Sequence, residues 1–392
     1  MQEYDVIIIG AGLAGLMAAR ELKDSKYLVI DSKKEIGLPL KCGEGIKKRD
    51  LDEVTDEKSF VKGIVKEHVL ALGEHRRTLN IEYYKLDRPE FEKWLGKDVN
   101  LKLDCQCKDV IIKDDHALVI TDDETYKSKL VILAYGAYYH VQEKYGLIDK
   151  KPEQLICYGG IFNNCKVDPN KFIFYSEDNV MGGFWIFPND ENEVNIGFGS
   201  FKGNVKQICY DLMKKFPELR DAKLVSEFGG IVPCSGAIKK TYHERLLVCG
   251  NAAGHVYGGS GEGISYALHG GKIAGKIASE ALKNNRFDEV FLSRFEERWK
   301  KKFGQELIGG KICIDLLKIA YKYNLGEKVF YHPKSSELFN IVDKGEFPLR
   351  ARFFWKFATI FNMENNYEQR KKIPFMFMVI YKLTKPILRL FS

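Results

Sequence analysis

The fold is decided near the start of the chain, in the stretch Tyr4-Asp5-Val6-Ile7-Ile8-Ile9-Gly10-Ala11-Gly12-Leu13-Ala14-Gly15. An apolar run that enters Gly-x-Gly-x-x-Gly and continues into an alanine-rich helical pattern predicts a strand, a tight turn and a helix. The glycines let the backbone approach a pyrophosphate closely, and the helix N-terminus faces the anion. A second apolar run ends at Asp31, where an acid that binds a ribose is expected. The sequence therefore predicts a Rossmann-like domain that binds a dinucleotide.

A second glycine-rich segment, late in the chain, indicates which dinucleotide is bound. It consists of Leu246-Leu247-Val248-Cys249-Gly250-Asn251-Ala252-Ala253-Gly254 and continues through Gly261-Glu262-Gly263-Ile264 into a helical pattern. The first motif alone suits NAD and FAD equally. The second resembles the segment of FAD-dependent reductases and hydroxylases that holds the ribityl chain and points a helix N-terminus at the flavin ring. The resemblance implies FAD, because a helix dipole there stabilises the negative charge that reduced flavin acquires.

Composition and charge exclude several classes of protein. A chain of 392 residues with 45% hydrophobic and 29% charged residues is long enough for two or three folded domains and too apolar for a disordered chain. The net charge of +7 is small, and no zinc-finger, RNP or helix-turn-helix signature is present, so we expect no nucleic-acid partner. The nine cysteines and eight histidines are dispersed without the spacing of metal ligands, so we expect no metal site.

The same features bear on the compartment. Dispersed cysteines, no signal peptide and no apolar run long enough to span a bilayer predict a cytoplasmic protein. The disulfide-rich intracellular proteins of hyperthermophiles are an exception that would allow Cys157 and Cys165 to pair. Residues 350–357 and 371–382 alternate basic clusters with aromatic and apolar side chains. These two segments suit peripheral contact with a membrane on the cytoplasmic face, or helices that close the core with snorkelling lysines.

The order of the patterns predicts an α/β protein, α+β overall, with a discontinuous Rossmann-like domain. The two glycine-rich segments bracket a stretch of alternating strands, which we interpret as an inserted antiparallel sheet that binds substrate. The expected division is an FAD-binding domain of residues 1–62, 85–150 and 241–290, a substrate domain of residues 63–84 and 151–240, and a C-terminal helical region of residues 291–392. No second Gly-x-Gly-x-x-Gly occurs, so we expect the electron donor, NAD(P)H or ferredoxin, to bind transiently.

Three further motifs carry a more specific resemblance. They are Lys41-Cys42-Gly43-Glu44-Gly45, Leu86-Asp87-Arg88-Pro89-Glu90-Phe91 and Trp185-Ile186-Phe187-Pro188. With the motif order of residues 1–290, they resemble the geranylgeranyl reductase family, most closely its archaeal branch that acts on digeranylgeranylglycerophospholipids. The second motif also predicts a helix start, with Asp87 as N-cap and Glu90 completing a capping box. The third is similar to that family's Y-x-W-x-F-P substrate-cavity motif.

Carried over by position, the resemblance implies a set of cofactor contacts. It places Gly10, Gly12, Ala14 and Gly15 at the pyrophosphate, Asp31 at the adenosine ribose, Val110 at the adenine, Arg88 at the ribityl-phosphate region, Asn251 at the ribityl hydroxyls, and Cys42, Gly43, Gly45, Gly263 and Ile264 along the isoalloxazine. Two positions depart from the family pattern. Asn251 replaces an Asp, which removes a charge but keeps hydrogen bonding. Gly183 replaces the Tyr of the cavity motif, which leaves the orientation of the substrate open.

Cys42 and Glu44 are the candidate catalytic residues, and each has a plainer alternative. Cys42 suits a passive buried thiol, but its glycine-rich polar loop favours a site role. Glu44 suits a solvated loop acid and a proton donor equally. Trp185 and Phe187 are two residues apart and so point to one face of a strand, which suits either the core of a sheet or a substrate-binding lipid channel.

The resemblance implies an FAD-dependent reductase that saturates C=C bonds in the geranylgeranyl chains of archaeal-type membrane lipids. We expect hydride transfer to one alkene carbon while a nearby acid protonates the other, which avoids a carbocation in an apolar channel. Two alternatives are a flavin-dependent monooxygenase of the same fold and an electron-relay flavoprotein with a membrane partner. Oxygen consumption coupled to hydroxylation would identify the first, and electron exchange with a protein that leaves lipids unchanged would identify the second.

Overall fold

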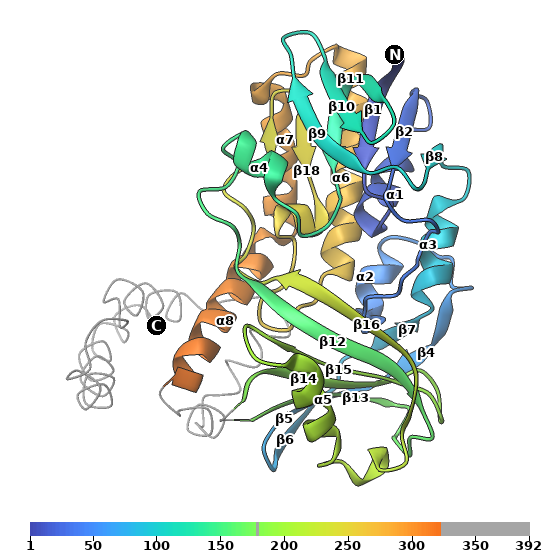
Figure 1. Cartoon of the computed structure of the whole chain (residues 1–392), viewed down its shortest axis with the longest axis vertical. Coiled ribbons are helices and arrows are strands. Elements are labelled where there is room, and N and C mark those ends of the chain that lie inside the picture. The colour runs from blue at the N-terminus through green and yellow to red at the C-terminus, as the bar shows by residue number, and fades with distance from the viewer. Residues whose placement is uncertain (178–179, 323–392) are drawn as a thin grey trace, which may run out of the picture. The chain divides into compact units, whose positions relative to one another are not determined.

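The structure is a computed structural model of the chain, and it describes residues 1–177 and 180–322. The two segments considered for membrane contact, residues 350–357 and 371–382, lie outside the described residues. Two large sheets lie at opposite ends of the described part and are joined by several crossings of the chain (Figure 1).

The sheet that contains the first glycine motif has eight strands. Its path runs β17-β18-β11-β1-β2-β8, and β10 and β9 branch from β11. The bounds are β1 (Gln2–Ile9), β2 (Tyr27–Ile30), β8 (Leu101–Lys102), β9 (Cys107–Ile112), β10 (Ala117–Thr121), β11 (Thr125–Leu133), β17 (Tyr242–His243) and β18 (Leu246–Val248). The central strand β1 pairs in parallel with β2 and β11. Both faces of this centre are covered, which explains why Val6, Ile7 and Ile8 form a continuous apolar run.

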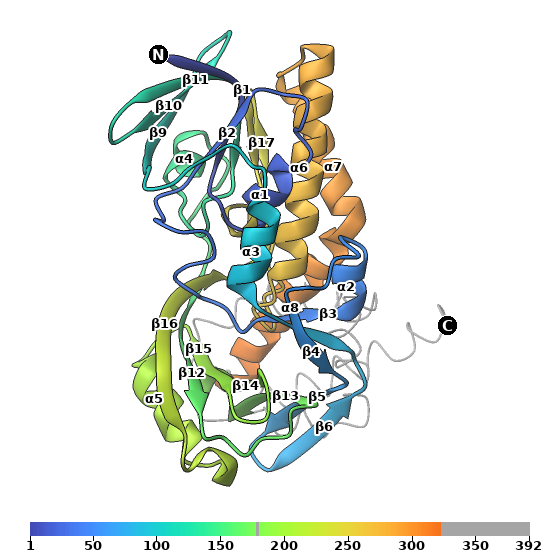
Figure 2. The ribbon, with the colours of Figure 1, turned by 90° about the vertical axis from the view of Figure 1, so that its right-hand side faces the viewer.

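Helices cover one side of this sheet, and the branching strands β9 and β10 lie toward the other (Figure 2). The helices are α1 (Leu13–Ala19), α3 (Arg88–Gly96), α6 (Ile264–Asn284) and α7 (Glu289–Trp299). The helices α1 and α6 pack at backbone distance, because a Cβ atom at Gly271 would lie 2.1 Å from the Ala14 carbonyl oxygen. This contact brings the N-terminal ends of the two helices, and so the two glycine-rich segments, to the same edge of the sheet.

The second sheet has seven strands in the order β16-β12-β15-β14-β13-β5-β6. The bounds are β5 (Glu67–Leu72), β6 (His75–Leu79), β12 (Gln154–Asn163), β13 (Lys171–Glu177), β14 (Val180–Pro188), β15 (Val194–Ser200) and β16 (Lys223–Pro233). All of its pairs are antiparallel except β13 with β5. Helix α5 (Val205–Met213) packs against β12 and β15. The sheet therefore joins strands from two separate parts of the chain.

A small third sheet and several short helices connect the two large sheets. The sheet has the order β3-β7-β4, with β3 (Gly45–Lys47), β7 (Tyr83–Leu86) and β4 (Val61–Val65). The remaining elements are α2 (Lys48–Asp52), α4 (His140–Lys144), η1 (Pro217–Leu219), η2 (Gly250–Ala253), the π-helix η3 (Lys300–Gly304) and α8 (Gln305–Lys322). The α/β class and the antiparallel sheet predicted from the sequence are confirmed. The proposed domain boundaries stay a prediction.

The start of α3 positions Arg88, and it follows the predicted signal only in part. The Asp87 carboxylate accepts a hydrogen bond from the Glu90 backbone N–H at 3.1 Å, as an N-cap does. The reciprocal bond of a capping box is absent in this part of the structure, since the Asp87 backbone N–H donates to the Phe60 carbonyl instead. The capping-box prediction was therefore wrong in its second half, because a neighbouring strand end competed for that N–H.

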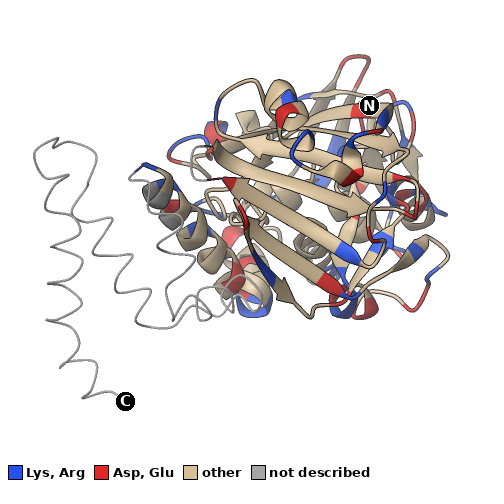
Figure 3. Ribbon diagram, turned by 90° about the horizontal axis from the view of Figure 1, so that it is seen from below, with Lys and Arg blue, Asp and Glu red and all other residues tan. Residues whose placement is uncertain are grey.

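The described residues carry charges of both signs and free cysteines. Lys and Arg are interspersed with Asp and Glu over the described ribbon (Figure 3). All nine cysteines are free, so Cys157 and Cys165 form no disulfide. Among residues 1–177 and 180–322, no group of His, Cys, Asp and Glu side chains is arranged to hold a metal ion. None of the helices in these ranges is both long and apolar enough to cross a bilayer.

His255 lies directly after the second glycine-rich turn and makes a testable contribution to stability. The side chain is fully buried among Phe295, Trp299 and Phe303, and neither ring nitrogen has a hydrogen-bond partner among the described residues. Burial lowers its pKa to about 3. Below about pH 6.5 the histidine binds a proton in the unfolded chain but stays neutral in the folded chain. The free energy of unfolding must therefore fall as the pH falls from about 6.5 toward 3.

We therefore expect His255→Leu to reduce the acid sensitivity of the fold. When the pH is lowered from 7 to 4, the free energy of unfolding of the variant should fall by about 3 kcal/mol less than that of the parent protein. Urea unfolding at the two pH values measures the difference. His140→Leu, at an exposed histidine, is measured in the same way as the control substitution. Equal acid sensitivity of His255→Leu and the parent protein would contradict the assignment.

Candidate active site

One cavity of about 1170 Å³ connects the glycine-rich turns to the face of the seven-stranded sheet. Most of the residues singled out from the sequence line it, namely Gly10, Gly12, Ala14, Asp31, Cys42, Gly43, Glu44, Gly45, Arg88, Trp185, Phe187, Asn251, Gly263 and Ile264. Gly15 and Val110 do not line it. Val110 is fully buried in the core, and the adjoining residues 105–108 line the cavity in its place.

Of the three glycines in the first glycine turn, residues 10–15, only Gly12 has open space at its Cβ position. A Cβ atom at Gly15 would lie 1.8 Å from the Gly10 carbonyl oxygen, so this glycine serves the close packing of strand and helix. Gly10 has a φ of +112°, which favours glycine. At Gly12, by contrast, a Cβ atom would meet nothing within 4 Å. The open space beside Gly12 belongs to the cavity.

Asp31 joins the end of β2 to this turn. Its carboxylate accepts hydrogen bonds from the Ala11 backbone N–H at 2.6 Å and the Lys33 backbone N–H at 2.8 Å. A carboxylate accepts about four hydrogen bonds, so it retains capacity for a ribose hydroxyl in the cavity.

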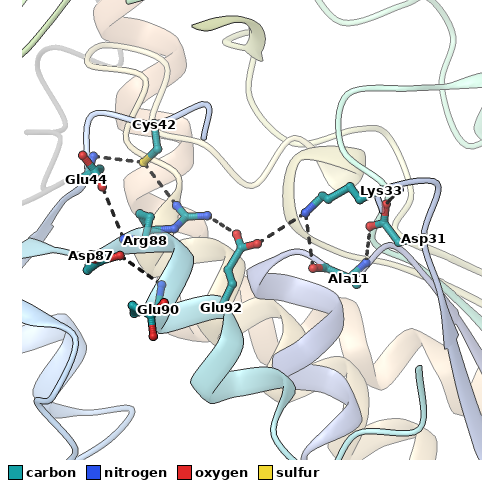
Figure 4. Close-up of polar contacts among 9 residues, drawn as sticks. All are labelled: Ala11, Asp31, Lys33, Cys42, Glu44, Asp87, Arg88, Glu90 and Glu92. Carbon is teal, nitrogen blue, oxygen red and sulfur yellow. Dashed lines mark hydrogen bonds and ion pairs between the residues drawn. The ribbon is translucent and has the colours of Figure 1, made fainter. Parts of the chain in front are cut away.

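The thiol loop, residues 41–45, lies beside the start of α3 (Figure 4). The Cys42 sulfur accepts hydrogen bonds from the Glu44 backbone N–H at 3.2 Å and from the Arg88 guanidinium at 3.3 Å. The loop turns sharply because Glu44 has a φ of +65°, which is rare for a residue other than glycine. Burial raises the pKa of the Cys42 thiol, and the Arg88 charge opposes the rise only in part. Cys42 is therefore a protonated thiol at neutral pH.

A chain of charges links the thiol loop to the first glycine turn (Figure 4). Arg88 donates to Glu92 at 2.5 Å, and Lys33 approaches the other Glu92 oxygen at 3.4 Å. Lys33 also lies 3.5 Å from the Ala11 carbonyl oxygen. Although burial opposes ionisation of Glu92, the charges of Arg88 and Lys33 hold its pKa below the usual range. The buried Nε of Arg88 has no hydrogen-bond partner among the described residues, so it is an unused donor.

Glu44 is the buried acid of the site, and only 3% of it is exposed. Its carboxyl group accepts from the Arg88 backbone N–H at 3.4 Å and from the side chain of Asn195 at 3.2 Å. Burial raises its pKa, while Lys62, Asn195 and Arg88 act in the opposite direction. Asn195 lies in β15 and was missed from the sequence, where its one signal is a polar side chain in the buried run Val194–Ser200.

The strand β14 separates core from cavity by simple alternation. Phe184 and Ile186 are buried in the core, whereas Trp185 and Phe187 line the cavity. Both rings therefore face the cavity, and their role in binding substrate stays a prediction. Phe187 also stacks on Phe172, with ring centroids 4.3 Å apart.

The Gly183 departure has a structural compensation. A Cβ atom at Gly183 would lie 2.2 Å from the ring of Phe174, so that ring fills the space above the glycine. Phe174 belongs to β13 and lines the cavity. An aromatic ring of the neighbouring strand β13 therefore occupies the space beside Gly183.

The second glycine turn, residues 250–254, brings Asn251 and the N-terminus of α6 to the same cavity. Gly263 is the N-cap of α6, and no side chain caps it. A helix of 21 residues that begins at a cavity offers backbone N–H groups and the positive end of its dipole to a bound group.

Comparison with known proteins found relatives in sequence and solved structures with a similar fold. No protein-family model matches the sequence. The digeranylgeranylglycerophospholipid reductase of Methanocaldococcus jannaschii is 32% identical over 337 residues, covering 78% of this chain and 84% of the relative. The protein of the same name from Methanococcus aeolicus is 31% identical over 332 residues, covering 77% and 83%.

Solved structures share the architecture. A geranylgeranyl bacteriochlorophyll reductase-like protein from Thermoplasma acidophilum aligns with a TM-score of 0.73 and 24% identity, over 81% of this chain and 88% of that one. A flavin-dependent brominase aligns with a TM-score of 0.68 and 16% identity, over 92% and 100%. At these identities the likeness shows the fold alone.

Proposed function

Since the chain belongs to the digeranylgeranylglycerophospholipid reductase family, we propose that it is an FAD-dependent reductase that saturates C=C bonds in the geranylgeranyl chains of archaeal-type membrane lipids. One observation carries this assignment. The glycine turns, the thiol loop and an aromatic sheet face line a single cavity, so a cofactor and an apolar chain fit end to end. The direct test is a gain of mass by a geranylgeranyl lipid incubated anaerobically with the reduced enzyme.

The residues present fit FAD. The open space at Gly12 accommodates a pyrophosphate, and Asp31 has capacity for a ribose hydroxyl. The orphaned Arg88 Nε and the uncapped start of α6 are donors for the ribityl-phosphate region and the pyrimidine end of the ring. When bound, reduced FAD supplies the hydride for alkene reduction. Asn251 and Val110 remain proposals carried over by position from the family.

We propose that the thiol loop supplies the proton that is added to the alkene. The Cys42 sulfur already accepts two hydrogen bonds, which leaves its S–H free to point into the cavity. Delivery of that proton to the alkene carbon leaves a thiolate, and the Arg88 guanidinium stabilises it at 3.3 Å. Glu44 lies two residues away and burial raises its pKa, so we propose it as the group through which the thiol regains its proton. Trp185, Phe187 and Phe172 exclude water from this step.

Two finer parts of the function are also proposals. We propose that NAD(P)H or ferredoxin reduces the cofactor by transient binding, because the chain carries one dinucleotide motif. We propose that the protein reaches its lipid as a cytoplasmic, peripheral membrane protein, with residues 350–357 and 371–382 as the contact. The composition of those two segments supports this proposal. We likewise keep the three-part domain division given by the sequence patterns.

Replacement of the Cys42 thiol gives the sharpest test within the site. Cys42→Ala should retain FAD, because backbone and ribose contacts hold the cofactor, while alkene reduction should fall by at least about tenfold. Bound-flavin absorbance and the initial rate of lipid reduction measure the two effects. Cys209→Ala is the matched control, since Cys209 is a free, fully buried thiol in the core of the second sheet. Unchanged turnover in Cys42→Ala would return this thiol to a packing role.

A further inference from the structure

Asn195 connects the thiol loop to the aromatic wall of the cavity. It lies in β15 and is 0% exposed. Its amide nitrogen donates to the Cys42 carbonyl oxygen at 2.8 Å and to a Glu44 carboxyl oxygen at 3.2 Å. Its amide oxygen accepts from the Trp185 indole N–H at 2.9 Å. The side chain thus touches three residues of the site without lining the cavity itself.

The chemistry of the partners fixes the orientation of this amide. An indole N–H only donates, so it requires the oxygen end of the Asn195 side chain. A backbone carbonyl oxygen only accepts, so it requires the nitrogen end of the amide, and the same nitrogen meets the Glu44 carboxyl oxygen. No apolar or acidic side chain of the same size satisfies all three partners at this depth. A fully satisfied buried polar group of this kind gives a unique arrangement rather than extra stability.

We propose that Asn195 is a positioning residue that holds the Glu44 carboxyl and the Cys42 backbone in place and couples them to Trp185 in the substrate channel. The inference rests on the proposed function for the roles of Cys42 and Glu44. Through these hydrogen bonds, the position of the Trp185 ring sets the geometry of the thiol loop. A lipid chain that moves the ring therefore changes the loop that protonates the lipid.

The charged groups around Glu44 determine how the loss of the Asn195 side chain changes the pKa of Glu44. Lys62 from β4 and Arg88 from α3 face Glu44 with positive charge, and Cys42 lies on its own loop. All of these remain in an Asn195 variant. Removal of the amide donor takes away one hydrogen bond that favours the ionised carboxylate, so the pKa of Glu44 must rise. The acid form then persists to higher pH.

The experiment compares Asn195→Leu with Trp185→Phe and with the double variant. The first readout is the rate at which iodoacetamide alkylates Cys42, followed by mass spectrometry of its peptide in protein without lipid. The second readout is the alkaline limb of the pH–rate profile of lipid reduction. Asn189→Leu is the matched control, because Asn189 is a buried asparagine of the same hairpin that bonds to Glu193 and touches no part of the thiol loop.

We expect Cys42 alkylation in Asn195→Leu to change by at least about fivefold, and the alkaline limb to move up by about one pH unit. Trp185→Phe should move both readouts in the same direction, and the double variant should go no further than Asn195→Leu. The control should match the parent protein. The proposal would be overturned if Asn195→Leu changed neither the alkylation rate of Cys42 nor the alkaline limb of the pH–rate profile. Additive effects in the double variant would also overturn it.

Should Asn195→Leu not fold, Trp185→Phe carries the same alkylation test, and no change in it counts against the coupling. The alkylation readout also separates this proposal from the proposed function. A wild-type protein that reduces no lipid, but whose Cys42 responds to Asn195 as expected, would refute the reductase assignment and support the positioning role. Normal lipid reduction with no response of Cys42 alkylation to the Asn195 substitution would support the reductase assignment and refute the positioning role.

Discussion

Gly12→Val is expected to abolish FAD binding in a protein that still folds. The backbone at Gly12 has a φ of −93°, which any residue adopts, and its Cβ position meets nothing within 4 Å. The added isopropyl group therefore occupies the cavity where the pyrophosphate approaches the turn. We expect the Kd for FAD to rise at least about a thousandfold, which corresponds to about 4 kcal/mol. Flavin absorbance after gel filtration and FAD titration measure the loss, and circular dichroism verifies the fold.

Two neighbouring substitutions make this result specific. Gly230→Val places a side chain in open space of the same cavity, on β16 of the second sheet, and should keep FAD. Gly15→Val should instead fail to fold, since its Cβ would lie 1.8 Å from the Gly10 carbonyl oxygen. FAD affinity of Gly12→Val equal to that of the parent protein would show that the pyrophosphate lies elsewhere.

Arg88→Met is expected to destabilise the fold strongly. The Arg88 and Glu92 side chains are 15% and 6% exposed, so removal of the cation leaves a buried carboxylate with Lys33 as its remaining partner. Breaking a buried pair in this way costs about 3 kcal/mol. The double variant Arg88→Met/Glu92→Met should recover most of that loss, because no charge is then left unpaired. Urea unfolding of the apoprotein measures both.

A surface pair provides the control for Arg88. Arg298 and Glu280 are 37% and 34% exposed, and their side chains form two hydrogen bonds. Exposed pairs contribute about 1 kcal/mol or less, so Arg298→Met should change the unfolding free energy little. Equal losses for Arg88→Met and Arg298→Met would contradict the account of a buried charge chain.

The parts of this protein that could be predicted from the sequence are those in which local backbone geometry dictates the residue. The glycines of the first turn and the strand–helix order around them follow from a close approach of backbone to backbone, which side chains cannot replace. The helix start before Arg88 is likewise local, since Asp87 caps a residue three positions on. In both cases the residues that carry the signal lie within a few positions of each other in the sequence.

The parts that could not be predicted depend on contacts between distant segments. Asn195 meets Cys42 across 153 positions, and Lys33 meets Glu92 across 59, so no spacing rule connects them. The ring beside Gly183 belongs to Phe174 on a neighbouring strand, and no short-range pattern in the sequence connects these two residues. Competition from the Phe60 carbonyl for the Asp87 N–H is equally non-local.

This cavity adds hydrogen across isolated alkenes, and single-turnover reduction of a lipid is the test of that activity. The purified enzyme is reduced chemically to its FADH2 form, oxygen is excluded, and a geranylgeranyl glycerophospholipid is added. We predict that flavin reoxidation accompanies a mass gain of two hydrogens for each bond saturated, in a one-to-one ratio. An unchanged lipid mass with flavin that is reoxidised only by oxygen or by a protein partner would contradict the claim.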